Sequence, residues 1–276
     1  MQRQRPPTRP LTNRELMPET IVLEICVDSV ESAVAAEKGG ANRVELCSSL
    51  VEGGVTPSRG LIATVRDRTS IGLQVMIRPR GGDFCYSADE FEAMKQDVLA
   101  AKKLGADGVV FGILAANGDV DIRRTRQLIQ LARPLQATFH RAFDMTRDQF
   151  HALENVIIAG ADRVLTSGGE PTAEAGRKAI AKLNKLANKR VAIMAGGGVT
   201  KSNVHDILDY TGIHEIHASV RVRVPSQMQH RNERISMGDI KGREYERFVV
   251  MAERVAHLLA AAHNGINRAS FTSKEK

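Results

Sequence analysis

The eight residues Gly160-Ala161-Asp162-Arg163-Val164-Leu165-Thr166-Ser167 contain the transition that decides the fold. A helical pattern ends at Gly160, and a β-branched strand pattern begins three residues later. Glycine adopts the left-handed conformation that ends a helix, alanine permits close packing beneath a sheet, and asparagine or aspartate turns the chain into the strand. The same pattern precedes two other strand patterns, as Gly40-Ala41-Asn42 and Gly105-Ala106-Asp107. This repetition indicates a regular alternation of helices and strands.

Short apolar runs rich in β-branched residues occur eight times along the chain, with helical patterns between them. We predict strands over 21–28, 43–49, 73–80, 108–114, 135–144, 163–167, 190–196 and 215–221. Helices are expected over 29–38, 88–104, 123–132, 147–159, 172–187 and 202–208, with a closing helix over 243–262. Alternating strands and helices form parallel sheets with right-handed crossovers. The predicted fold class is therefore α/β, a single-domain (β/α)8 TIM barrel, and an open doubly wound sheet is the alternative.

Charge separates the ends of the chain from its body. Four of the arginines and no acidic residue lie in 1–14, and three basic residues and one glutamate lie in 263–276, so these ends hold six of the seven excess positive charges. We expect a disordered basic tail over 1–20, a barrel over 21–263 and a flexible tail over 264–276. The body is nearly neutral, only 4% of residues are aromatic and none is Trp, so nucleic acid is not an expected partner.

The location in the cell is suggested by what the sequence lacks. The N-terminal stretch has no apolar core of a secretory signal, and no run of residues has the length of a membrane span. Three cysteines at irregular spacing are typical of free thiols in a reducing compartment. We predict a cytoplasmic protein, with the nucleus as a further location and with no membrane partner.

Two neighbouring predicted strands carry the same Glu-x-Cys pattern, Glu24-x-Cys26 and Glu45-x-Cys47. Alternate residues of a barrel strand face the interior, and the apolar residues between these positions face the helices. Adjacent strands are about 4.8 Å apart, so both sulfurs project into one space. Paired thiolates suit a soft ion such as Cu(I), whereas Zn(II) prefers four ligands. The alternative is that both cysteines are small buried apolar residues.

The third, fifth and eighth predicted strands add polar residues to the interior. Arg78 is expected to reach the barrel mouth, where an inward arginine needs an anion. That anion is Glu24 or Glu45 in a structural network, or else a carboxylate or phosphate of a substrate. His140 is expected to face inward from the fifth strand, as are His217 and Ser219 from the eighth. Two inward histidines with two glutamates and an arginine around one ring favour a functional site, in which Glu24, Glu45 and His140 are the candidates for acid or base chemistry.

A triple glycine, Gly196-Gly197-Gly198, follows the seventh strand and leads toward a helix. Barrels commonly bind phosphate at this place through backbone N–H groups, so these glycines and Ser219 form a candidate anion site. The alternative is a simple tight turn. The polar segment 223–242 breaks the alternation of strands and helices, and we expect it to be a mobile loop beside the mouth.

The longer motifs around these residues are specific enough to identify a family. They are EICVDSVESA at 24–33, RVELCS at 43–48, EGGVTPS at 52–58, VMIRPRGGDF at 75–84, TFHRAFD at 138–144, RVLTSG at 163–168 and the triple glycine. Over about 23–236 the sequence resembles the copper homeostasis protein CutC family, and it looks closest to the animal members. The sequence departs from the family pattern in the basic N-terminal tail, at Cys85 and in the far C-terminal segment.

The resemblance implies a cytoplasmic (β/α)8 barrel that handles copper and assembles into homo-oligomers. It also favours Cys26 and Cys47 as the ligands of Cu(I). The main functional hypothesis is therefore a copper homeostasis protein whose paired thiolates bind a copper ion inside the barrel. The alternative hypothesis is a barrel enzyme that acts on a small anionic or phosphorylated substrate at the mouth, with Glu24, Glu45, Arg78 and His140 as its catalytic groups. The resemblance names no reaction, so it leaves open whether the protein is an enzyme.

Overall fold

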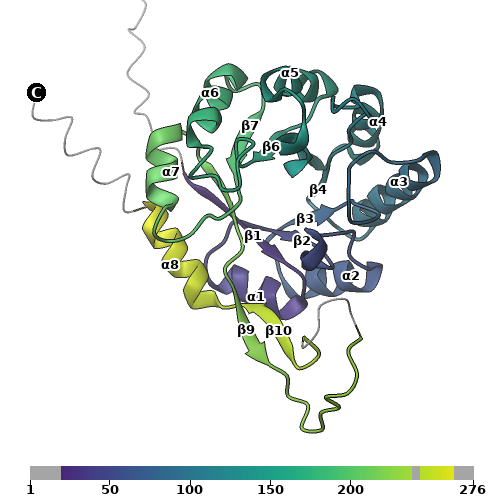
Figure 1. Cartoon of the computed structure of the whole chain (residues 1–276), viewed down its shortest axis with the longest axis vertical. Helices are drawn as coiled ribbons and strands as arrows, with labels where there is room; N and C mark the ends of the chain where they lie inside the picture. The colour runs from purple at the N-terminus through teal and green to yellow at the C-terminus, as the bar shows by residue number, and fades with distance from the viewer. Residues whose placement is uncertain (1–19, 238–242, 264–276) are drawn as a thin grey trace, which may run out of the picture.

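Eight parallel strands form a closed barrel in the order β1 to β8, as the alternation in the sequence predicts. The computed structural model describes residues 20–237 and 243–263, and Figure 1 shows the barrel and its surrounding helices. The strands are β1 (Val22–Val27), β2 (Arg43–Leu46), β3 (Gly72–Met76), β4 (Gly108–Phe111), β5 (Gln136–Phe139), β6 (Arg163–Thr166), β7 (Ala192–Ala195) and β8 (Glu215–Ala218). The expected (β/α)8 barrel is confirmed, and the open sheet is excluded.

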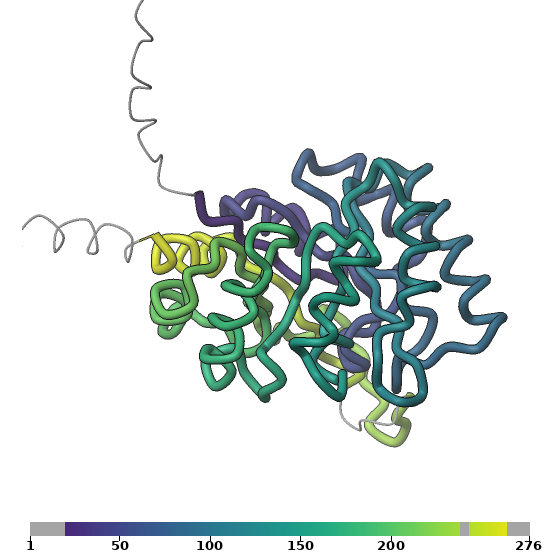
Figure 2. Tube along the Cα trace, turned by 90° about the horizontal axis from the view of Figure 1, so that it is seen from above, coloured from purple at the N-terminus to yellow at the C-terminus, as the bar shows by residue number. Residues whose placement is uncertain are grey.

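Helices cover the outside of the barrel. They are α1 (Val30–Lys38), α2 (Arg59–Arg68), α3 (Ala88–Lys103), α4 (Ile122–Ala132), α5 (Gln149–Ala159), α6 (Arg177–Ala187), α7 (Val204–Thr211) and α8 (Ala252–His263). The last helix lies beside the first, so the ring of helices closes as the sheet does (Figures 1 and 2). Among the described residues, no helix is both long and apolar enough to cross a membrane.

The repeated Gly-Ala-Asn/Asp pattern ends a helix and forms a hydrogen bond to the neighbouring strand. Gly40, Gly105 and Gly160 all have φ between 82° and 94°, the left-handed conformation that ends a helix. The polar residue of each pattern then accepts a hydrogen bond from a backbone N–H at the start of the adjacent strand. These bonds are Leu23 N to Asn42 Oδ1 at 2.7 Å, Leu73 N to Asp107 Oδ2 at 2.8 Å and Ala137 N to Asp162 Oδ2 at 2.7 Å.

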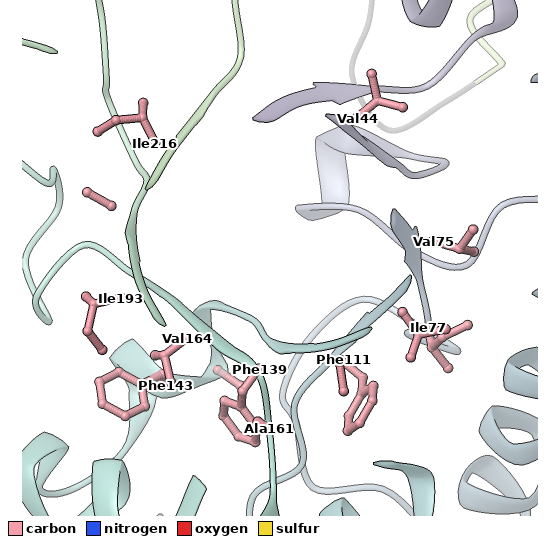
Figure 3. Packing of buried hydrophobic residues seen from close by; sticks show 14 of the residues in the cluster. Val44, Val75, Ile77, Phe111, Phe139, Phe143, Ala161, Val164, Ile193 and Ile216 are labelled. Carbon is pink, nitrogen blue, oxygen red and sulfur yellow. The ribbon is translucent and has the colours of Figure 1, made fainter. Parts of the chain in front are cut away.

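Two separate apolar clusters confirm the predicted alternation of the strands. The large cluster lies between strands and helices, and Figure 3 shows Val75, Phe111 and Phe139 pointing from their strands into it. The small cluster lies inside the barrel and contains Cys26, Cys47, Met76 and Val110. Burying a large aliphatic or aromatic side chain contributes about 1.5–3 kcal/mol. The outer cluster therefore supplies most of the apolar stabilisation and leaves the interior available for polar groups.

Several predicted boundaries are wrong. The strand expected over 135–144 ends at Phe139, and a 3-10 helix over Arg141–Met145 follows it. In that helix the Asp144 carboxylate accepts hydrogen bonds from the Ser167 N–H and hydroxyl groups. These bonds turn the chain toward the end of β6, so residues 141–145 do not continue strand β5. Helix α2 was not among the predicted helices. Its mean hydropathy is low because charged residues fill its exposed face, and Ile62 and Val65 are the residues that it buries.

The segment expected to be a mobile loop over 223–242 is partly ordered. Strand β9 (Arg221–Pro225) pairs antiparallel with β10 (Glu246–Val250), which forms a hairpin between β8 and the closing helix (Figure 1). Alternation of arginine and valine over 221–224 explains this extended conformation. The closing helix consequently begins at Ala252 rather than at 243. Residues 238–242 lie outside the described residues, as do the predicted tails apart from Thr20.

Candidate functional site

The carboxyl ends of the barrel strands surround a cavity of 480 Å³, which we call the mouth. Among the candidate residues it is lined by Cys26, Glu45, Arg78, His140, Gly197, Gly198 and Ser219. Glu24 and Cys47 lie just beneath this surface and are fully buried. Active sites of (β/α)8 barrels form at this end of the sheet, because the loops that follow the strands meet there. The mouth is therefore the place where the candidate residues can act together.

The two sulfur atoms lie close together inside the barrel. Cys26 is on β1, and Cys47 follows the last residue of β2 and continues the ladder through a 2.9 Å bond from its N–H to the carbonyl of Val27. Both cysteines are free, and their Sγ atoms lie within 4.8 Å of each other and of a Glu45 carboxylate oxygen. The Cys47 Sγ atom lies 3.5 Å from Glu45 Oε2. The Glu-x-Cys pattern thus brings two soft donors and one carboxyl group together.

The two thiols differ in acidity. A hydrogen bond from Cys47 lowers the pKa of Cys26 to about 5, against the opposing effect of burial, and His217 adds to the shift. The same hydrogen bond and burial raise the pKa of Cys47 well above its ordinary value. The pair therefore carries one proton, with a Cys26 thiolate accepting from the Cys47 thiol. A thiolate is the form that binds metal ions.

His217 on β8 links the two glutamates. Its Nδ1 atom lies 2.8 Å from Glu24 Oε1, and its Nε2 atom lies 3.8 Å from Glu45 Oε2. Burial disfavours the imidazolium, but Glu45, Cys26 and Glu24 together raise the pKa of His217 well above its ordinary value. The sequence places His217 in the interior beside the candidate residues but gives it no chemical role. The structure brings it to the centre of the site.

The two glutamates are in opposite protonation states at neutral pH. Burial alone would raise the pKa of Glu24, but its hydrogen bond with His217 and the charge of Arg43 lower that pKa to about 2. Burial raises the pKa of Glu45 to about 8. Glu24 is therefore a carboxylate and Glu45 mostly a neutral carboxylic acid near pH 7. Such a separation of two carboxyl groups allows one to accept and the other to donate a proton.

A buried ion network that the sequence analysis missed forms the floor of the site. Arg43 Nε is 2.6 Å from Glu24 Oε2, and Arg43 also pairs with Glu215, which in turn pairs with Arg163. Arg43, Arg163 and Glu215 are the first residues of β2, β6 and β8. A charged residue at the same position of several strands was the available signal. Because strand starts share one level of a barrel, these charges meet across the interior.

Arg78 does not pair with Glu24 or Glu45. Its guanidinium donates to the carbonyls of Glu52, Gly54 and Gly82 at 2.6–2.9 Å and stacks on the Phe84 ring at 5.1 Å. Arg43 instead takes Glu24 as its partner. The Arg78 Nε atom is buried and has no hydrogen-bond partner among the residues described. The expectation of an ion pair with either glutamate is therefore wrong, and Arg78 remains a buried cation without a carboxylate.

His140 is the second buried donor at the mouth. Its Nδ1 atom accepts from the Ala142 N–H at 3.2 Å, so its proton is on Nε2. Within the described part of the chain, Nε2 is buried without a partner. Burial and the neighbouring charge of Arg78 lower the pKa of His140 to about 3, so the ring is neutral near pH 7. Phe84 lies between the two donors, with its ring 5.1 Å from that of His140.

The triple glycine forms an irregular rim rather than a direct entry into a helix, because α7 begins only at Val204. Gly197 and Gly198 have φ of 100° and 69° and line the mouth. A Cβ atom on Gly196 would lie 2.5 Å from Leu165 Cδ1, so close packing explains that glycine. Ser219, across the rim, accepts from Arg221 Nε at 3.1 Å. The mouth thus brings together Gly197, Gly198 and Ser219 of the predicted anion site.

The fold and this site define a (β/α)8 barrel protein with thiol, carboxyl and imidazole groups at its mouth. The chain belongs to the CutC family, whose sequence model matches residues 21–222. A CutC family protein from Bacteroides fragilis is 49% identical over 236 residues, which cover 85% of this chain and 94% of the relative. The human copper homeostasis protein cutC homolog is 47% identical over 244 residues, covering 88% and 89%. The expected likeness to animal members is present, and bacterial members share it.

Solved structures agree with this assignment. A Streptococcus agalactiae protein described as a candidate copper homeostasis protein CutC is 36% identical, with a TM-score of 0.69 over 72% of this chain and 98% of that one. Thiamine phosphate pyrophosphorylase from Pyrococcus furiosus aligns with a TM-score of 0.55 over 90% of this chain and 98% of its own. At 17% identity, the second match is a likeness of fold alone.

Proposed function

We propose that this protein takes part in copper homeostasis by binding Cu(I) between Cys26 and Cys47 inside the barrel. The observation that carries the proposal is the distance between two free, buried sulfurs, which is within 4.8 Å. Bonds from a metal to a thiolate are about 2.3 Å long, so an ion between the two sulfurs spans about 4.6 Å. Two thiolates with no full tetrahedral ligand set suit Cu(I). The name of the human relative, a copper homeostasis protein homolog, agrees with this choice.

The residues around the sulfurs support binding of a soft cation. Cys26 is already a thiolate, and Cys47 must lose its proton when the ion binds. Met76 and Val110 pack against the pair as apolar neighbours, which suits a soft cation. The Glu45 carboxyl group lies 3.5 Å from Cys47 Sγ. Because it is mostly neutral near pH 7, it cannot take up the proton that Cys47 loses, which is released to solvent when the ion binds. The ion is the cargo of such a protein rather than a part of its fold.

The test is an anaerobic titration of the reduced protein with Cu(I) in the presence of a competing chelator. We expect the wild type to withdraw one equivalent of Cu(I) and the double variant Cys26→Ser, Cys47→Ser to withdraw none. The variant Cys85→Ser is the matched control, because Cys85 is an exposed thiol in a loop outside the barrel interior. Equal affinity of the double variant and the wild type would reject the copper site.

A second candidate function is an enzyme acting on a small anionic substrate at the same mouth. The observation that favours it is the pair of buried donors, Arg78 Nε and His140 Nε2, which lack partners among the described residues. The buried Glu45 Oε1 atom is unpartnered in the same part of the chain. Leaving such atoms unpaired typically costs about 1–3 kcal/mol each, and a ligand with an anionic group and a hydroxyl or amino group would satisfy them.

This second function is tested by thermal denaturation in the presence of small carboxylates and phosphorylated metabolites. A ligand raises the melting temperature by mass action. We expect Arg78→Lys to reduce the increase, because a lysine cannot reproduce the guanidinium donors. Arg80→Lys serves as the control, since Arg80 pairs with Glu90 and Asp83 outside the mouth. If no anion stabilises the wild type, the enzyme hypothesis fails.

Two further properties complete the proposal. A cytoplasmic location, with the nucleus as a second one, follows from the expected reducing environment of the thiols. Assembly into homo-oligomers follows from the family resemblance, and light scattering of the purified protein measures it directly. Cell fractionation of the tagged full chain tests the location.

A further inference from the structure

A second cavity, of 410 Å³, lies beside the mouth and is called the outer pocket here. It is bounded by the rim after β7, the end of β8 and the first turns of α8, and its lining includes Lys201, Arg254, His257 and Leu258. Four residues line both the outer pocket and the mouth, namely Val199, Thr200, Ser219 and Arg221. A molecule bound in one of these cavities can therefore extend into the other.

The outer pocket is lined by basic side chains without acidic ones. Lys201, Arg254 and His257 are exposed, and none of their side chains forms a hydrogen bond or ion pair with the residues described. Arg221 is the exception, because it donates to Ser219 and lies 3.6 Å from an Asp28 oxygen. At least two positive charges therefore face the pocket without compensation. A cavity lined by charges of one sign concentrates ligands of the opposite sign.

The backbone adds further donors at the edge between the two cavities, where Val199 lines both of them and Gly197 and Gly198 line the mouth. In the described chain, the N–H groups of Gly197, Gly198 and Val199 form no hydrogen bond. The positive φ angles of the two glycines, 100° and 69°, let the chain curve here. A Cβ atom on Gly198 would lie 2.9 Å from Thr172 Cγ2, which adds a reason for glycine at this position. Successive free N–H groups on curved backbone form a concave site for an anion.

We propose that the outer pocket binds the phosphoryl group of a small phosphorylated molecule whose remaining part extends into the mouth. A phosphoryl group offers three acceptor oxygens and close to two negative charges, which match Lys201 and Arg254 together with the free N–H groups at the edge shared with the mouth. This inference deepens the second candidate function, since it assigns the substrate class and the place of its anionic end. It is independent of the copper site, because Cys26 and Cys47 do not line the outer pocket.

The experiment measures binding of glycerol 3-phosphate to the full chain by isothermal titration calorimetry, with glycerol as the neutral comparison. We expect binding of the phosphate ester and none of glycerol. In the double variant Lys201→Gln, Arg254→Gln, affinity should fall at least about tenfold, because two charge-assisted contacts are lost. The control Lys103→Gln, Lys185→Gln removes the same charge from the last turns of α3 and α6, at the opposite end of the barrel.

The outcomes separate this inference from the two proposed functions. Binding must persist in the variant Cys26→Ser, Cys47→Ser, which lacks the copper ligands. Arg78 lines the mouth and not the outer pocket, so Arg78→Lys should weaken binding less than the Lys201→Gln, Arg254→Gln variant does. Equal affinity in the wild type and the Lys201→Gln, Arg254→Gln variant would overturn the proposal, as would an equal loss in the Lys103→Gln, Lys185→Gln control. Absence of any binding by the wild type would overturn it as well, whatever the result of the copper titration.

Discussion

The imidazole of His217 and the carboxylate of Glu24 form a 2.8 Å contact between the last and the first strand of the barrel. The two residues are direct neighbours in the register that joins β8 to β1. The contact at the seam of the sheet is thus also part of the floor of the mouth. Barrel closure and the protonation of the site are consequently coupled through the same two side chains.

Replacing Glu24 by Gln should strongly destabilise the protein. The substitution keeps the volume but leaves Arg43 and His217 buried without their shared carboxylate. Breaking a buried ion pair by removing one partner costs about 3–5 kcal/mol. Urea denaturation measures this loss. The matched control is Glu31→Gln, which removes an exposed pair with Arg247 and should change the free energy of unfolding by about 0–1 kcal/mol. Similar losses in both variants would contradict the central role of Glu24.

The buried His140 should make the fold sensitive to acid. Its pKa is lowered from 6.5 to about 3 in the folded protein, so between these values the unfolded chain binds a proton that the folded chain does not. Above pH 6.5 neither state binds this proton, and the free energy of unfolding is at its full value. As the pH falls from 6.5 toward 3, the free energy of unfolding decreases by about 1.4 kcal/mol per pH unit. We expect the stability of His140→Gln to fall less steeply over this range. The control His151→Gln, at an exposed position on α5, should keep the wild-type slope.

The three cysteines should react with a thiol reagent at different rates. Cys85 is exposed, whereas Cys26 and Cys47 are 7% and 0% exposed. A chromogenic disulfide reagent should modify one thiol per native chain quickly and all three after unfolding in denaturant. The fast reaction should disappear in Cys85→Ser. A fast reaction that persists in this variant would show that the interior sulfurs are accessible, contrary to the structure.

Gly39 should not tolerate a side chain. A Cβ atom there would lie 2.5 Å from Val255 Cβ and 2.6 Å from the Ala252 carbonyl, so Gly39→Ala must push α8 away from α1. Such overpacking costs about 1–3 kcal/mol. The control Gly60→Ala lies within α2, where the nearest atom is 4.0 Å away, and it should stabilise the protein by up to about 1 kcal/mol. Thermal unfolding compares the two variants, and equal melting temperatures would disprove the tight contact.

The barrel was predictable because its signals are local and repeated. The Gly-Ala-Asn/Asp pattern marks helix ends, and the structure shows that its third residue also binds the adjacent strand. The hairpin was harder to recognise. Strands β9 and β10 are separated by a polar segment with few hydrophobic residues. Strand β10 also packs against α1, a helix that is distant from it in the sequence. Strand pairing over such a separation leaves little trace in a local pattern.

The site was predictable to the extent that it follows strand alternation. Glu-x-Cys on two neighbouring strands placed both sulfurs in the interior, and the structure has them there. The partners of the two arginines were not predictable, because they depend on how far along the barrel axis each side chain lies. Arg43, at the start of its strand, reaches Glu24, whereas Arg78 follows the end of β3 and lies among loop carbonyls. Alternation in the sequence predicts which face of a strand a side chain occupies. It does not predict which side chain from another strand that residue contacts.

The β9–β10 hairpin is held at its base, where the Val250 N–H donates to Ser32 Oγ at 3.1 Å and Arg247 pairs with Glu31. Beyond that base the chain leaves the body of the protein, and Met237 is 85% exposed. Residues 226–237 belong to none of the barrel strands or surrounding helices. Residues 226–237 therefore offer a position for attaching a fluorophore or an affinity tag without altering the packed interior.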